Sequence, residues 1–320
     1  MERRALGSSG VEVSRLALGA MTFGTGMPPI SNVDAAAAEA MIERAIGAGV
    51  NLVDTADAYS GGESESILAP VLARHRDELL VATKVGFASA GGAPLSPQSV
   101  RSAVEDSLRR LRIDRIDVLY LHRPDRSTPI DTTFDELDAL AGRGLVRSVG
   151  VSNWRAGETA YAVGRQRATG RLEPTSVQVY WSLVGRDVEQ EIVPTCAQLG
   201  VGVVVWSPLA AGYLTGRGDG RRAAYAFPPV DDGIGHRVLE GLGRVATQLG
   251  VSPARVALAW LLHRPDVDSV IVGASSLGQL DDNLAAADLQ LDADQLAILE
   301  DASAVAPIYP RWWDAAMGVG

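Results

Sequence analysis

Four side chains of complementary chemistry lie in the first half of the chain: the Asp54 carboxylate, the Tyr59 phenol, the Lys84 amine and the His122 imidazole. A phenol is a poor proton donor near neutrality because its pKa is about 10. A neighbouring ammonium stabilises the phenolate and lowers that pKa, which would make Tyr59 a competent general acid. Asp54 could keep Lys84 charged and oriented, and His122 could donate a hydrogen bond to a carbonyl oxygen. Together they would polarise and protonate a carbonyl group.

Lys84 is the only lysine among 29 basic residues, so arginine has displaced lysine almost everywhere else. An ammonium has a pKa and hydrogen bonds that its surroundings can tune, whereas a guanidinium stays protonated. A lysine that had persisted at random would more often lie on a surface helix. The position of Lys84 in an apolar run therefore favours a functional role.

Apolar, β-branched runs alternate with helical patterns from one end of the chain to the other. Runs that are almost continuously apolar are typical of parallel strands buried on both faces. The predicted strands lie near residues 14–19, 50–56, 78–85, 115–122, 145–152, 175–181, 201–207 and 268–275. Ser96-Pro97 and Ser252-Pro253 have the sequence of helix starts. Eight such units favour an α/β fold, a (β/α)₈ TIM barrel forming a single domain over residues 1–320.

Three segments lie outside this alternation. Residues 3–16 contain a glycine turn between short extended runs and predict an N-terminal hairpin that plugs the bottom of the barrel. The glycine-rich residues 209–235 predict a long loop at the C-terminal face, a binding loop or lid and not a domain boundary. Residues 307–320 carry Tyr309, Trp312 and Trp313, which could fold over the barrel mouth or pack on its flank.

The barrel prediction brings the reactive side chains together. In a TIM barrel the active site lies at the C-terminal ends of the strands. Asp54, Lys84 and His122 end the second, third and fourth predicted strands, and Tyr59 follows in a loop. Taken singly, Asp54 could cap a helix, Tyr59 could pack in a loop and His122 could cap the barrel rim. Their conjunction at one mouth, with the only lysine among them, favours a site.

Composition excludes several other classes of protein. A net charge of −10 argues against general nucleic-acid binding. No apolar run reaches the roughly 18 residues of a membrane span, and the N-terminus lacks a secretory signal. The single Cys196 excludes an intrachain disulfide, fits a reducing compartment and is expected to be a buried structural thiol. We therefore expect a cytoplasmic protein, and no metal-ligand spacing predicts a metal site.

The motifs resemble those of the aldo-keto reductase superfamily, in the family's order and over nearly the whole chain. The matching segments are VDTADAY–GGESE at 53–65, ATKVG at 82–86, YLHRPD at 120–125, GVSNW at 150–154, VQVYWSL at 177–183, VWSPLAAGYLTGR at 205–217 and IVGASSLGQLDDNL at 271–284. The resemblance implies a catalytic tetrad of Asp54, Tyr59, Lys84 and His122. It also implies a reversible, NAD(P)H-dependent reduction of aldehydes or ketones to alcohols, with Tyr59 as general acid and base.

The same resemblance implies where a nicotinamide cofactor would bind. Ser152, Asn153 and Gln178 would hold the carboxamide, and Trp206 would stack on the nicotinamide ring. The other implied contacts are Met21, Thr22, Asp54, Ser207, Pro208, Leu209, Gly212, Leu214, Arg217, Gly273, Ser275, Gln279 and Asn283. From the residues alone, Trp206 could instead be a core aromatic, and Ser152-Asn153 a helix cap.

Coenzyme choice is where this chain departs from the family pattern. Many relatives carry lysine or arginine just after the last strand to bind the 2′-phosphate of NADP, whereas Ala274, Ser275 and Ser276 stand here. We expect NADP, with NAD as the alternative. Arg217 could supply the missing charge, or be a solvated loop residue.

Two further interpretations use the same scaffold: a cofactor-binding regulatory subunit similar to the channel-associated β subunits, and a purely structural barrel. An intact tetrad favours an enzyme whose partner is a small carbonyl or alcohol. The physiological substrate and the oligomeric state are not encoded in these motifs.

Overall fold

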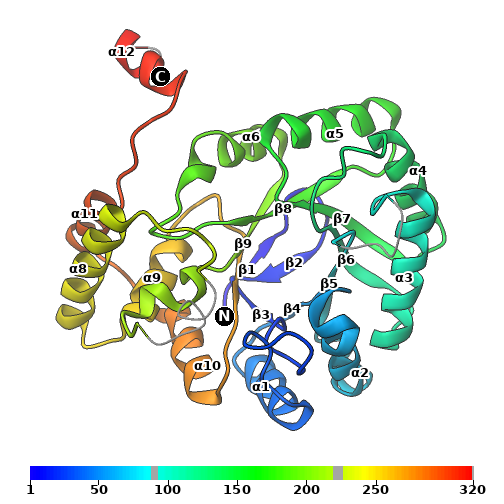
Figure 1. The fold of residues 1–320 in the computed structure, drawn as a ribbon, viewed down its shortest axis with the longest axis horizontal. Helices are drawn as coiled ribbons and strands as arrows, with labels where there is room; N and C mark the ends of the chain where they lie inside the picture. The colour runs from blue at the N-terminus through cyan, green and yellow to red at the C-terminus, as the bar shows by residue number, and fades with distance from the viewer. Residues whose placement is uncertain (88–92, 219–225, 319–320) are drawn as a thin grey trace.

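The eight predicted strands form a closed parallel barrel at the centre of the molecule, surrounded by helices (Figure 1). The computed structural model describes residues 1–87, 93–218 and 226–318. Around the barrel the strands follow the order β10-β3-β4-β5-β6-β7-β8-β9, so the first strand of the barrel pairs with the last. The strands are β3 (Leu16–Gly19), β4 (Leu52–Asp54), β5 (Leu80–Val85), β6 (Ile116–Leu121), β7 (Val146–Ser152), β8 (Pro174–Tyr180), β9 (Gly202–Trp206) and β10 (Ser269–Val272). The predicted (β/α)₈ TIM barrel is confirmed.

Helices connect consecutive strands and bury their apolar faces against the barrel. Asp34, Ser96 and Ser252 begin three of these helices by accepting a backbone N–H of the first turn, and proline follows each serine. The helices are α1 (Ala35–Gly47), α2 (Glu63–His75), α3 (Pro97–Leu111), α4 (Ile130–Gly142), α5 (Ala156–Thr169), α6 (Ile192–Leu199), α8 (Asp232–Leu249), α9 (Pro253–Leu262), α10 (Leu277–Leu284), α11 (Ala293–Ala302) and α12 (Arg311–Met317).

The predicted N-terminal hairpin is confirmed as β1 (Arg3–Ala5) paired antiparallel with β2 (Glu12–Ser14). Its apolar residues Leu6, Val11 and Val13 are fully buried and pack in one cluster with inward-facing barrel residues. The hairpin therefore closes the end of the barrel opposite the C-terminal ends of the strands, which leaves those ends as the open mouth.

The long segment after β9 is only partly a loop. It begins with a 3₁₀ turn, η3 (Ala210–Thr215), and residues 219–225 lie outside the described residues. The predicted loop extended to residue 235, but α8 already begins at Asp232, because the Asp231 carboxylate accepts the Ile234 N–H at 2.9 Å and caps the helix.

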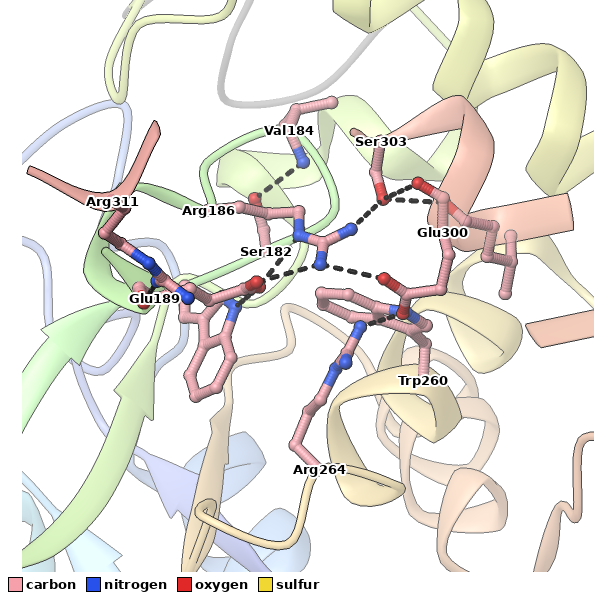
Figure 2. A network of polar contacts seen from close by, with 11 residues as sticks. Ser182, Val184, Arg186, Glu189, Trp260, Arg264, Glu300, Ser303 and Arg311 are labelled. Atoms are coloured by element: carbon pink, nitrogen blue, oxygen red, sulfur yellow. Dashed lines mark hydrogen bonds and ion pairs between the residues drawn. The ribbon is translucent and has the colours of Figure 1, made fainter. Parts of the chain in front are cut away.

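A group of charged and polar side chains fixes the loop between β8 and α6 to α9 and α11 (Figure 2). We call it the Arg186 cluster; its members are Arg186, Glu189, Trp260, Arg264, Glu300 and Ser303. The Arg186 guanidinium donates to both Glu189 oxygens at 2.8 Å, contacts the Glu300 carboxylate at 2.8 Å and donates to Ser303 Oγ at 2.7 Å. The Trp260 indole donates to the same Glu300 at 2.8 Å. This cluster links segments more than 100 residues apart in the sequence.

The C-terminal tail neither closes over the mouth nor packs along the flank. It leaves α11 and ends in α12, which projects away from the barrel (Figure 1). Tyr309, Trp312 and Trp313 are about half exposed or more. The Arg311 guanidinium donates to the Glu189 carbonyl and ties the tail to the Arg186 cluster.

No single helix among the described residues has both the length and the apolar character needed to cross a membrane. The pair α8 and α9 passes that test of length and composition only when taken together, across a bend of 97°.

Candidate active site

The Lys84 ammonium is the centre of the predicted tetrad. It is 1% exposed and donates to Asp54 Oδ1 at 2.5 Å, to the Thr55 carbonyl at 2.8 Å and to Tyr59 Oη at 3.1 Å. Burial opposes the charged form, but the Asp54 carboxylate and the Tyr59 oxygen outweigh it and raise the pKa of Lys84. The ammonium therefore stays protonated beside the phenol. Asp54, Tyr59 and Lys84 meet as predicted.

Backbone pairing beyond the strand ends brings Tyr59 to Lys84. The Thr55 N–H donates to Ala82 at 2.9 Å, and the Asp57 N–H donates to the Lys84 carbonyl at 3.1 Å. The chain after β4 thus continues alongside β5. A turn, η1 (Tyr59–Gly62), then leads into α2, with Ser60 in the left-handed region at φ 49°. A serine is uncommon there, and its hydroxyl is bonded to the Phe23 carbonyl at 3.2 Å.

An arginine from α3 passes beneath this turn. The φ of Gly62 is 92°, a conformation that favours glycine, and a Cβ there would lie 2.7 Å from Arg110 Cδ and Nε and displace that side chain. Arg110 Nε donates to the fully buried Glu65 at 2.7 Å, and Glu65 accepts from Thr83 Oγ1 at 2.6 Å. Because Thr83 precedes Lys84, this chain of contacts joins the turn carrying Tyr59 to the strand carrying Lys84.

His122 completes the tetrad at the end of β6. Its ring centroid lies 6.0 Å from that of Tyr59, with the rings nearly perpendicular at 81°. Burial, together with the positive charges of Lys84 and Arg123, lowers the pKa of His122 to about 3. The imidazole is therefore neutral and can donate its N–H to a substrate oxygen. Its Nδ1 is buried, and no described residue is its hydrogen-bond partner.

The predicted carboxamide ligands form one network beside the tetrad. Gln178 Nε2 donates to Asp54 Oδ2 at 2.7 Å, and Ser152 Oγ donates to the Gln178 carbonyl at 2.9 Å. Asn153, held in the left-handed region at φ 62°, donates to the His122 carbonyl at 3.1 Å and to Ser152 Oγ at 3.0 Å. Its amide oxygen accepts the Trp206 indole N–H at 3.1 Å. The structure therefore brings Ser152, Asn153, Gln178 and Trp206 to the tetrad.

The Trp206 ring lies among other aromatic side chains at the mouth. Phe227, from the long segment after β9, is nearly parallel to it at 14°, with 6.1 Å between the centroids. Tyr180, on the neighbouring strand, lies at 5.3 Å and 38°. Trp206 is only partly buried, so it is a residue of the rim and not a core aromatic.

The predicted phosphate-binding stretch follows β9 as a tight turn. Ser207, Ala210 and Ala211 adopt left-handed conformations, and Ser207 Oγ accepts the Ala211 N–H at 3.1 Å. Pro208 and Leu214 are buried, Leu209 is partly buried, and nothing lies within 4 Å of a Cβ placed at Gly212. The exposed Arg217 ends this stretch, and no described carboxylate forms an ion pair with it.

The predicted adenosine segment follows β10. The Ser275 N–H donates to Gln279 Oε1 at 2.9 Å, and Asn283 Nδ2 donates to the Gly273 carbonyl at 3.2 Å. Gly273 is exposed, with nothing within 4 Å of a Cβ position. Thr22 is buried, and its hydroxyl donates to the Ala274 carbonyl at 2.9 Å. Thr22 thus joins the first and last strand ends, and the partly exposed Met21 lies beside it.

Sequence reasoning missed the residues that support the tetrad. Glu65 lies within the quoted GGESE motif, so its place in the sequence was visible, but its role was not. Arg110 looks like one of many helical arginines until α3 packs against α2. Phe227, Phe87 and Arg123 line the mouth from loops, where no periodicity marks a residue. Cys196 is buried as expected, and burial raises the pKa of its thiol to about 12.

A parallel barrel with this constellation at the C-terminal ends of its strands is the architecture of a (β/α)₈ enzyme. Residues 15–304 match the model of the aldo/keto reductase family. The chain therefore belongs to this family, which is one of oxidoreductases that generally use nicotinamide cofactors.

Relatives of similar length carry two kinds of name. The chain is 33% identical over 309 residues to a probable voltage-gated potassium channel subunit beta of Oryza sativa subsp. japonica, covering 90% of this chain and 92% of the relative. A protein of the same name from Arabidopsis thaliana matches to the same extent. Probable aldo-keto reductase 1 of Glycine max is 33% identical over 305 residues, covering 91% and 86% of the two chains.

Proposed function

We propose that this protein reduces aldehydes or ketones to alcohols, reversibly, with NADP(H) as coenzyme and Tyr59 as general acid and base. The observation that carries the proposal is the Lys84 ammonium, buried at 1% exposure and in contact with both Asp54 and Tyr59 Oη. A buried charge costs several kcal/mol unless it is paired. A fold that needed only packing would place an apolar side chain there.

The mechanism follows from these contacts. A bound nicotinamide supplies or accepts the hydride. Tyr59 Oη protonates the carbonyl oxygen, and Lys84 stabilises the phenolate that remains. Neutral His122 donates a hydrogen bond to the same oxygen and holds the carbonyl in position. In the oxidation direction the Tyr59 phenolate takes the proton of the alcohol.

The residues present fit a nicotinamide cofactor. An indole at Trp206 and amide groups at Asn153 and Gln178 lie next to the tetrad, which suits a planar ring that carries a carboxamide. The backbone is open at Gly212 and Gly273, where close approach by a ligand needs no side chain to move. Arg217 would hold the 2′-phosphate, because a guanidinium fork binds two phosphate oxygens. We expect NADPH to be preferred, by a smaller margin than in relatives with a basic residue after the last strand.

A steady-state assay tests the proposal. We expect the purified protein to oxidise NADPH with members of an aldehyde panel, and Tyr59→Phe to lower kcat by about 10²–10⁴-fold, the usual contribution of general acid catalysis. Binding of NADPH, followed by quenching of tryptophan fluorescence, should remain unchanged because Tyr59 acts on the substrate. A variant that keeps more than half of wild-type kcat would contradict the assignment of Tyr59.

The names of two relatives raise a second candidate, a subunit associated with an ion channel. The complete tetrad and its supporting contacts favour the enzyme.

We further propose a cytoplasmic location, on the basis of the single buried Cys196.

A further inference from the structure

An arginine and a phenylalanine form a pair at the mouth, directly beside His122. The Phe87 ring centroid lies 4.9 Å from that of His122, and the Arg123 guanidinium carbon lies 5.5 Å from the Phe87 centroid. The Arg123 guanidinium carbon therefore lies no farther from the centre of the His122 ring than the sum of these two distances. Phe87 is 51% exposed and Arg123 is exposed, so the pair faces solvent at the entrance to the site.

The charge of Arg123 has no partner of opposite sign within the described part of the chain. Among the residues that the structure describes, no carboxylate lies within ion-pair distance of its guanidinium. Neighbouring charges are already engaged: Asp125 accepts from Ser127, Thr128 and the Leu95 N–H, and Arg126 contacts Glu158. The positive charge of Arg123 acts at the site, since it contributes to the lowered pKa of His122. A cation–π contact with one ring leaves N–H groups of a guanidinium available to an anion.

The cofactor phosphates do not use this charge. The segments proposed to hold them follow β9 and β10, whereas Arg123 follows β6. Around the closed barrel, β6 is four strands from β10 in either direction and three strands from β9 by the shorter way, so Arg123 lies across the mouth from both segments. An anion that meets Arg123 while its carbonyl is at Tyr59 and His122 must therefore belong to the substrate.

We infer that the substrate is an aromatic or apolar carbonyl compound that carries a carboxylate, with Arg123 binding the carboxylate and Phe87 packing against the hydrocarbon part. The inference rests on the proposed function for the location of the reacting carbonyl. Arg123 determines specificity and is not a catalytic residue, because it acts at the end of the substrate remote from the reaction.

The test compares an acid with its neutral ester in a binding assay that needs no turnover. Titration of the NADP⁺-saturated protein, which has no hydride to transfer, with 4-carboxybenzaldehyde and with methyl 4-formylbenzoate, followed by tryptophan fluorescence, gives the ratio of the ester Kd to the acid Kd. We expect the acid to bind more tightly. In Arg123→Met, which keeps an unbranched, flexible side chain and removes the charge, the ratio should fall by about 10- to 100-fold, as for loss of a charged hydrogen bond. Arg123→Lys should restore part of the preference.

The matched control is Arg126→Met, an exposed arginine three positions further along the chain that contacts Glu158. It should leave the ratio unchanged, and 0.5 M KCl should reduce the preference of the wild type because salt screens exposed charges. An acid preference that survives in Arg123→Met, or no preference in the wild type, overturns the inference.

Turnover of 4-carboxybenzaldehyde and methyl 4-formylbenzoate, measured in parallel, tests the proposed function separately. If neither is reduced while the Kd ratio still depends on Arg123, the proposed reaction fails and the anion site stands.

Discussion

Two groups of charges, a buried one around Lys84 and a partly buried one around Arg186, show what lysine and arginine do in this protein. In the Arg186 cluster every nitrogen of the guanidinium is bonded, and both carboxylates also accept from tryptophan: Glu189 from Trp181 at 2.9 Å and Glu300 from Trp260 at 2.8 Å (Figure 2). Its members are bonded to one another, although the buried Arg264 Nε has no hydrogen-bond partner among the described residues. This cluster fixes a loop to two helices.

Around Lys84 the bonds are arranged differently. The ammonium is fully bonded, but one of its partners, Tyr59, reaches the mouth, and the neighbouring His122 keeps an unpaired Nδ1 among the described residues. A compact ammonium shifts the pKa of its partner and adjusts to a change in charge, whereas the planar fork of arginine fixes geometry. The difference indicates that contact with the mouth, through Tyr59, separates the reactive group from the structural one. Four variants test this comparison.

The largest effect is expected from Lys84→Arg. The charge is kept, but the larger planar group cannot take the place of an ammonium held by Asp54, Thr55 and Tyr59. We expect kcat for aldehyde reduction to fall by about 10²–10⁴-fold, as for loss of the general acid itself. Circular dichroism controls for folding. Activity equal to wild type would mean that the single lysine of this chain is a coincidence.

Arg186→Met should affect stability and not chemistry. Removing Arg186 leaves partly buried partners uncompensated, and because the Glu300 side chain is 38% exposed the loss in the free energy of unfolding should be smaller than the roughly 3–5 kcal/mol of a fully buried pair but larger than that of a surface pair. Urea unfolding measures this loss, and kcat under native conditions should stay within twofold of wild type. The control is Arg165→Met, which removes a surface pair with Asp131 and should cost about 0–1 kcal/mol. A large loss of kcat in a folded Arg186→Met protein would break the distinction between the two clusters.

Arg217 represents a third environment, an exposed arginine with no carboxylate partner among the described residues. If its partner is the 2′-phosphate, Arg217→Ala weakens NADPH binding by about 1.5–3 kcal/mol and leaves NADH nearly unchanged. Fluorescence titration of both coenzymes against both proteins measures the two losses. Equal losses would remove Arg217 from the coenzyme site.

The smallest effect concerns acid stability. The pKa of His122 is about 6.5 in the unfolded chain and is lowered to about 3 in the folded protein. Between these two pH values the unfolded chain binds a proton at His122 and the folded protein does not. Stability is therefore lost as the pH falls through this window, by about 1 kcal/mol between pH 7 and pH 5.5.

Unfolding curves of wild type and His122→Asn across this range isolate the contribution of His122. Asp57, whose pKa burial and the nearby Glu65 raise to about 6, acts in the opposite sense in both proteins and cancels in the difference. A variant with the same pH dependence as wild type would show that the pKa of His122 is the same in the folded protein and in the unfolded chain.

The sequence by itself determined the barrel and the positions of the tetrad. Parallel strands buried on both faces must be continuously apolar, so each of the eight was visible as a local pattern. Since barrel strands share one direction, a polar residue at the end of such a run is placed at the mouth without knowledge of any contact. For this reason Asp54, Lys84 and His122 could be grouped in advance, and Tyr59 with them.

Only the tertiary structure decided what surrounds these residues. Arg110 lies under Gly62, Phe227 lies over Trp206 and Arg123 stacks on Phe87. The members of each pair come from separate elements or loops, with no shared periodicity to reveal them. The tail shows the same limit: its aromatic residues suggested either a cover for the mouth or packing on the barrel flank, yet α12 points away from the barrel, held by Arg311 at Glu189. Burial along a strand or helix is a local property that repeats in the sequence, whereas a contact between loops depends on how the whole chain closes.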